Sequence, residues 1–130
     1  MSERLRLSLP PNKDAPGIAR SFVIDRGSGL PPDVVNDAEL LVSELVSNAV
    51  LHGSPSITLC VDFDPPCIGV GVRDEGDAVP TTAVHPPPPS LPRGRGLIIV
   101  DRLAESWGVT PSEPPPGKTV WFELGAGAPG

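Results

Sequence analysis

Two polar side chains near the middle of the chain have a spacing that could bring them to one chemical task. Glu44 and Asn48 lie four residues apart within a stretch of helical periodicity, so both should project from one face of a helix. A carboxylate can activate a hydroxyl or a water, and an amide oxygen is a hard ligand suited to Mg²⁺. Taken alone, the spacing fits an ordinary exposed glutamate and asparagine equally well.

Two further groups of residues suit an anion and a planar ring. Gly94-Arg95-Gly96 directly precedes an apolar stretch. Its glycines would let the backbone approach an anion closely, and a helix start offers free amide groups. Asp74 and Gly76 follow an alternating apolar segment, where the carboxylate could accept an amino hydrogen of adenine and the glycine would leave room for the ring. The plain alternatives are a loop-to-helix junction and a β-turn.

Two long helices are predicted to position these residues. Residues 14–26 carry apolar side chains at helical spacing, with Asp14 available as the N-cap. A longer run from about 33 to 52 begins after Pro31-Pro32 and ends at His52-Gly53, with proline first and glycine last as helices favour. Its apolar stripe consists of Val35, Ala38, Val42, Leu45, Val46 and Ala49.

Five segments alternate between apolar and polar residues or are short and apolar, as strands are. Pro65-Pro66 would form the turn of an antiparallel hairpin, and Gly96 would open a short apolar helix. These elements predict an α+β two-layer sandwich, with helices on one face of a mixed, mostly antiparallel sheet. The expected strands are 5–9, 57–61, 68–72, 107–109 and 120–124.

The length of 130 residues suits a single domain spanning 1–130. Hydrophobic residues make up 38% of the chain, which is enough for a globular core. The 19 prolines are clustered, above all in a segment of about 77–93, where they cannot donate helix or ladder hydrogen bonds. This segment is predicted to be a long loop. The tail 125–130 is expected to be flexible.

Charge and hydropathy exclude several classes of function. The net charge of -6 argues against direct nucleic-acid binding, which needs clustered Lys and Arg. No apolar stretch approaches the roughly 20 residues of a membrane span, and the amino terminus lacks a signal-peptide core, so a cytoplasmic protein without membrane contact is expected. Cys60 and Cys67 are too few for a zinc site and are predicted to be packed thiols that could face each other across the hairpin.

Four blocks in a fixed order give the chain a specific resemblance. The blocks are Ser43–Gly53 (SELVSNAVLHG), Val72–Gly76 (VRDEG), Gly94–Val100 (GRGLIIV) and Gly117–Val120 (GKTV). Together they resemble the anti-sigma-factor serine/threonine kinase family, within the superfamily of gyrase, heat-shock chaperone, mismatch-repair and histidine-kinase ATPases (GHKL). The resemblance extends over nearly the whole chain and implies the Bergerat-type ATP-binding fold.

The resemblance implies a role for each matching residue, with ATP and Mg²⁺ as cofactors. Asn48 resembles the Mg²⁺ ligand, and Glu44 resembles the catalytic base for the attacking hydroxyl. Asp74 resembles the adenine reader, with Gly76 beside it and Thr119 as a further contact on the adenine side. The phosphate-binding loop corresponds to Gly94, Arg95, Gly96 and Leu97, and the proline-rich segment takes the place of the ATP lid.

The family function implied is phosphorylation of a serine or threonine on a small anti-sigma-factor antagonist, together with sigma-factor binding. Dimerisation through the amino-terminal strand and first helix is also implied. The chain departs from the family pattern at Ala78, where a second glycine is common, and in its proline-rich lid. These departures favour the alternative of a nucleotide-gated protein-binding switch without efficient catalysis.

Two less favoured interpretations remain. A histidine-kinase catalytic domain would normally follow a dimerising helical hairpin with a phosphoacceptor His, and no such hairpin precedes the motifs. An α+β interaction domain that binds no nucleotide is the other.

Overall fold

The computed structural model describes residues 3–27, 29–51, 55–75, 103–111 and 117–125. Within these residues the chain forms two α-helices and five β-strands. The helices are α1 (Ala15–Arg26) and α2 (Pro32–Leu51), and the strands are β1 (Glu3–Leu9), β2 (Ile57–Asp64), β3 (Cys67–Asp74), β4 (Ser106–Pro111) and β5 (Lys118–Leu124).

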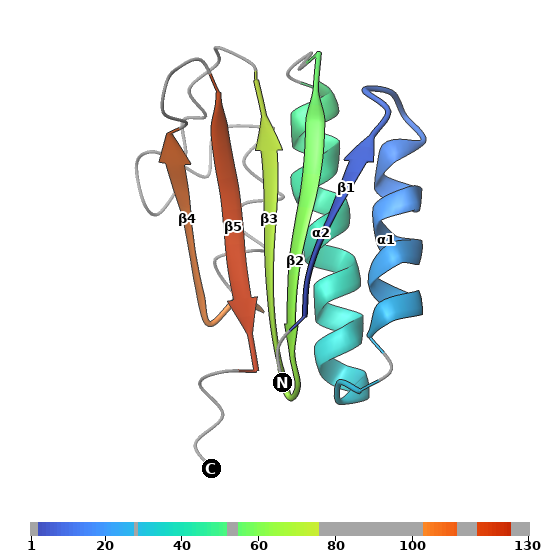
Figure 1. Ribbon diagram of the computed structural model, residues 1–130, viewed down its shortest axis with the longest axis vertical. Helices are drawn as coiled ribbons and strands as arrows, with labels where there is room; N and C mark the ends of the chain where they lie inside the picture. Colours follow the sequence, from blue (N-terminus) through green and yellow to red (C-terminus); the bar gives the residue numbers. More distant parts are fainter. Residues whose placement is uncertain (1–2, 28, 52–54, 76–102, 112–116, 126–130) are drawn as a thin grey trace.

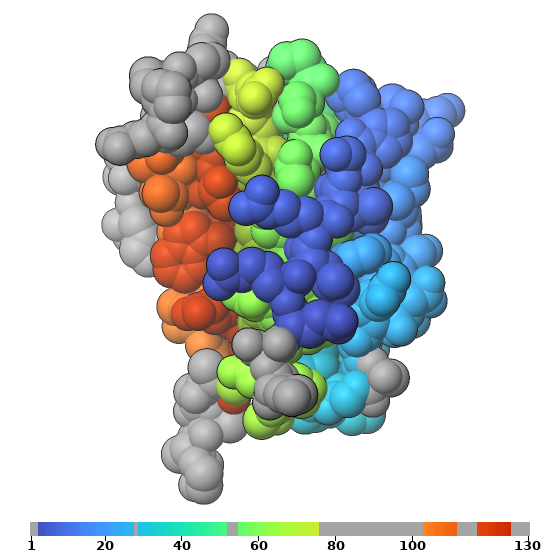
Figure 2. All heavy atoms as spheres, in the orientation of Figure 1, coloured from blue at the N-terminus to red at the C-terminus, as the bar shows by residue number. Residues whose placement is uncertain are grey.

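The strands form one sheet in the order β1-β2-β3-β5-β4, and every pairing among the described residues is antiparallel. Both helices lie against one face of this sheet; α2 is seen behind β2 and β1, next to α1 (Figure 1), and it also packs on β3. The α+β two-layer architecture predicted from the sequence is therefore confirmed. The opposite face has no helix over it among the described residues, and the side chains of the strands form its surface (Figure 2).

The core lies between the helices and the sheet because each element has one apolar face. Side chains on β2 alternate between buried and half-buried, and α2 buries a stripe at helical spacing. The predicted stripe is confirmed, except that Val35 is half-buried and Leu41 joins it. The largest fully buried side chains are Phe122, Leu41, Ile57, Leu59 and Ile68.

The start of α1 differs from the prediction. Asp14 stands at the N-cap position, but its side chain makes no capping hydrogen bond, because its backbone is already helical (φ -81°, ψ -18°). The Asn12 side chain instead accepts a hydrogen bond from the Asp14 amide at 2.9 Å. The turn before α1 is therefore held by Asn12.

The two cysteines do not face each other. Cys60 on β2 lies opposite Gly71 of β3, whereas Cys67 lies opposite Asp64. Both thiols are free and half-buried. The expectation of thiols facing each other across the hairpin was wrong, because the hairpin turn lies closer to Cys67 than to Cys60.

Candidate functional site

Three chain segments bring two predicted site residues, Asn48 and Asp74, and one lysine that the sequence did not predict to one end of the molecule. The carboxyl end of α2, the carboxyl end of β3 and the amino end of β5 all lie at the top of the view in Figure 1. The first carries Asn48, the second carries Asp74 and the third carries Lys118. Helix α2 packs directly on β3, so the helix and strand ends are held in a fixed relation.

Glu44 and Asn48 both lie on α2 and both are half-buried. Residues four apart on a helix share one face, so the predicted pairing of carboxylate and amide is present in the fold. One turn of α2 is also fixed against α1, because the Arg20 guanidinium donates a hydrogen bond of 2.8 Å to the Ser43 hydroxyl. This contact holds the helix next to Glu44.

The Asn48 side chain has an unusual environment. Its Nδ2 atom is buried, and no partner accepts its hydrogen bonds within the described part of the chain. A buried unsatisfied polar atom costs about 1–3 kcal/mol, and where it occurs it commonly marks a contact to an ion, a water or a ligand. The oxygen and nitrogen of an amide exchange places when it flips, so the same environment can present Oδ1 to a cation.

Asp74 is buried at the end of β3 and forms an ion pair with Lys118. The Lys118 ammonium donates to Asp74 Oδ1 at 2.9 Å, and Asp74 is 2% and Lys118 6% exposed. They are the buried charged residues of the described chain. A charge removed from water needs such a partner, because an unpaired buried charge is strongly disfavoured.

Strand register places Lys118 beside Asp74. The two residues are direct partners across β3 and β5, and Lys118 shares its face of β5 with buried Phe122 and Leu124. Gly117 precedes it with φ 116°, a backbone conformation that favours glycine, and so sets the chain entering β5. The prediction from sequence missed Lys118, although the alternation of residues 118, 120, 122 and 124 places it on the apolar face.

Thr119 is not brought together with Asp74. It is the partner of Arg73 on β3, and its Cγ2 atom would lie 3.1 Å from a Cβ atom at Gly71, on the face away from the helices. Neighbouring residues of a strand point to opposite faces, so Thr119 and Lys118 cannot both face the carboxylate. The structure thus places Lys118 beside Asp74, and the role of Thr119 as a contact on the adenine side stays a prediction.

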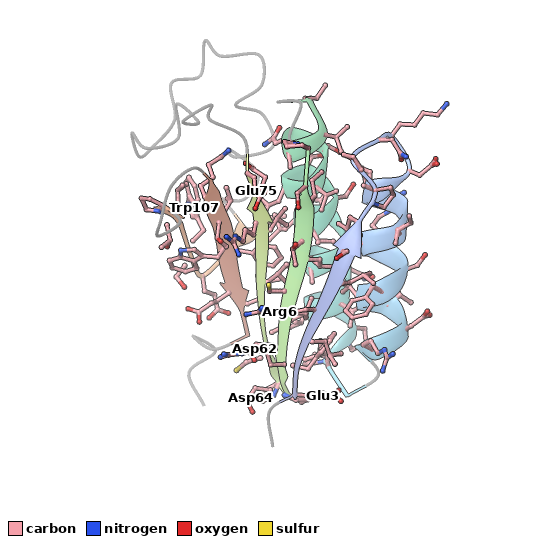
Figure 3. All side chains as sticks on the ribbon, turned by 45° about the horizontal axis from the view of Figure 1, so that its top comes forward. Glu3, Arg6, Asp62, Asp64, Glu75 and Trp107 are labelled. Atoms are coloured by element: carbon pink, nitrogen blue, oxygen red, sulfur yellow. The ribbon has the colours of Figure 1, made fainter. Side chains whose placement is uncertain are left out.

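The remaining predicted site residues lie outside the described residues. They are Gly76, the lid segment 77–93, and the phosphate-loop residues Gly94, Arg95, Gly96 and Leu97. Glu75, the last described residue before them, is exposed at the end of β3 (Figure 3).

A hollow of about 280 Å³ lies on the opposite face of the sheet. It forms over Gly69 and Gly71, which carry no side chains, between Arg6 of β1 and Trp121 of β5. Residues 69 and 71 face the other side of β3 from residue 74, and Asp74 does not line the hollow. It is separate from the candidate site.

Two structural findings bear on metals and membranes. Among the described residues, no group of three His, Cys, Asp or Glu side chains is placed to hold a metal ion. No helix in the described ranges is long and apolar enough to cross a membrane. Mg²⁺ that is bound to the phosphates of a nucleotide needs few protein ligands. Asn48 therefore remains the candidate protein ligand for Mg²⁺.

The model of the histidine kinase-like ATPase domain matches residues 14–124, which is most of the chain. This chain belongs to the histidine kinase-like ATPase domain family. The matched region includes both helices, four strands and every candidate site residue named above. A search of curated proteins found no significant match.

A solved structure has the same fold. The structure of the RsbU and RsbW domains of Rv1364c from Mycobacterium tuberculosis superposes with a TM-score of 0.67 and 19% sequence identity. The match covers 93% of this chain and 32% of that one, so this chain spans about a third of the length of its structural relative. At 19% sequence identity, this similarity supports the assignment of the fold alone.

Proposed function

We propose that this ATPase-family domain binds ATP with Mg²⁺ at the end of α2, β3 and β5. The observation that carries the proposal is the buried Asp74 carboxylate at the end of β3, in a chain whose family model covers residues 14–124. The unsatisfied Asn48 amide on the neighbouring helix supports it. Asp74 would accept a hydrogen bond from the amino group of adenine, and Asn48 would hold Mg²⁺.

We further infer that the domain is a serine/threonine kinase acting on a small anti-sigma-factor antagonist, and that it binds a sigma factor. This part of the proposal depends on the four ordered motifs and on Glu44. Bound ATP would supply the γ-phosphoryl group and leave as ADP, and Mg²⁺ would offset the charge of the phosphates. Glu44 lies one turn from Asn48 and would accept the proton of the incoming hydroxyl.

Nucleotide binding is tested by calorimetric titration of the full chain with ATP, with and without Mg²⁺. Binding that strengthens with Mg²⁺ in the native chain, but not in Asn48→Ala, is expected. The absence of heat at millimolar nucleotide would contradict the proposal.

Kinase activity is tested by incubating the chain with Mg²⁺-ATP and a candidate antagonist protein, and reading the mass of the antagonist. Glu44→Gln keeps the size and loses the charge of the side chain. It should bind ATP within about twofold of the native chain and lose transfer by about 10²-fold or more. ATP binding without transfer to any antagonist would instead favour the nucleotide-gated switch.

A further inference from the structure

The carboxylate assigned to base recognition already has a cation beside it. Lys118 Nζ lies 2.9 Å from Asp74 Oδ1, and the two side chains are 7% and 3% exposed. A nucleobase that reaches Asp74 must therefore meet Lys118 as well. Lys118 must either leave the carboxylate or take part in recognition.

We propose that Lys118 is a second base-recognition residue, donating to the ring nitrogen N1 of adenine while Asp74 accepts from the neighbouring amino group. This inference rests on the proposed function, since it requires adenine at Asp74. The Watson–Crick edge of adenine presents one donor and one acceptor side by side, and an aspartate–lysine pair offers the complementary acceptor and donor.

The burial of the pair favours recognition over displacement. Separating Lys118 from Asp74 would leave two buried charges without each other, which is the costly arrangement for groups removed from water. Keeping them together preserves the pair. An ammonium has three donors, and the hydrogen bond to Asp74 Oδ1 uses one, so a second acceptor can be served without breaking the first contact.

A carboxylate without an adjacent cation would bind the Watson–Crick edge of adenine less well. It attracts the amino group of adenine but repels the lone pair of N1, whereas an adjacent ammonium attracts that lone pair. The order of donor and acceptor is reversed on guanine, which presents a carbonyl oxygen and a protonated N1. The fixed placement of Asp74 on β3 and Lys118 on β5, directly opposite each other, thus determines which base edge fits.

The test compares ATP with 1-deaza-ATP, in which N1 is replaced by a C–H group, by calorimetric titration of the full chain with Mg²⁺. The native chain should bind 1-deaza-ATP about tenfold more weakly than ATP, because a hydrogen bond from a charged donor is lost. Lys118→Met should bind ATP about tenfold more weakly and should no longer distinguish the two nucleotides. Lys13→Met is the matched control, since Lys13 is exposed and lies before α1.

Equal affinity of the native chain for both nucleotides would overturn the inference and leave the proposed function standing. Tighter ATP binding by Lys118→Met would also overturn it, because that result means Lys118 competes with the base. No ATP binding by the native chain would overturn the proposed function itself. If Lys118→Met does not fold, ATP labelled with ¹⁵N at N1 gives a second readout on the native chain: the N1 resonance should move upfield on binding, and an unmoved resonance would contradict the inference.

Discussion

The sheet carries one described ion pair on each of its faces, and their geometries are similar while their surroundings differ. Asp74 and Lys118 face the helices at 2.9 Å, with side chains 3% and 7% exposed. Arg4 and Asp62 lie on the other face at 3.2 Å, with side chains 75% and 43% exposed. The buried pair was removed from water on folding, and each of its charges now depends on the other. The charges of the exposed pair remain in contact with water, so water can replace the partner of each at little cost in free energy.

The difference shows that a charged residue affects the stability of this fold chiefly where it is buried. Hydrogen bonding to Asp62, followed by its negative charge, raises the pKa of Arg4. When folding raises the pKa of a cation, the resulting stabilisation is fully present at pH values below the pKa of the unfolded chain. It is lost only as the pH rises through the pKa of the folded chain. Both lie far above neutral pH, so we expect no pH dependence of stability from Arg4 in the range where proteins are studied.

The largest predicted effect is on the buried pair. Lys118→Met should lower the free energy of unfolding by about 3–5 kcal/mol, because Asp74 would remain buried without its cation. Urea unfolding at pH 7 measures the change. The double variant Asp74→Leu with Lys118→Met should recover most of the loss, since it removes both charges. A single variant as stable as the native chain would show that the pair is not effectively buried.

The second effect separates binding from stability at the same end of the sheet. Asn48→Ala removes an amide whose Nδ2 is unsatisfied, so the free energy of unfolding should change by no more than about 1 kcal/mol. The affinity for Mg²⁺-ATP should fall about 10–100-fold, as expected for the loss of a contact to a charged ligand. Calorimetry and urea unfolding give the two numbers. Equal losses in both would indicate a structural role for Asn48.

The third effect concerns the packing of the face without helices. A Cβ atom at Gly108 would lie 2.8 Å from Trp121 Cζ2, whereas one at Gly69 would approach nothing closer than 3.7 Å. Gly108→Ala should therefore lower the free energy of unfolding by about 1–2 kcal/mol through overpacking, and Gly69→Ala should not. Thermal unfolding of both variants checks this. Equal melting temperatures would mean that the Trp121 ring moves aside freely.

The smallest effect is expected at the exposed pair. Arg4→Met should leave the urea midpoint within experimental error of the native chain, because surface ion pairs contribute little and salt screens them. The measurement is repeated at low and high salt. A loss comparable to that of Lys118→Met would remove the distinction between the two faces.

Much of the fold follows from local patterns in the sequence. The apolar stripe and the flanking proline place α2 within one residue of its predicted bounds, and alternation or short apolar runs locate all five strands. These signals are local because a helix or strand buries one face and repeats with its own period. Glu44 and Asn48 share a face for the same reason. The cap of α1 was predicted less well, because whether Asp14 caps depends on its own backbone angles.

Only the tertiary structure decided what stands beside Asp74. The partner is 44 residues away in sequence, and the choice between Lys118 and Thr119 depends on the register of β5 against β3. A shift of one residue in that register exchanges the two faces of the strand. The sequence by itself determined the family motifs, the elements and a carboxylate at the end of β3. The pairing of that carboxylate with a buried lysine arose from strand register, which is a long-range property of the folded sheet.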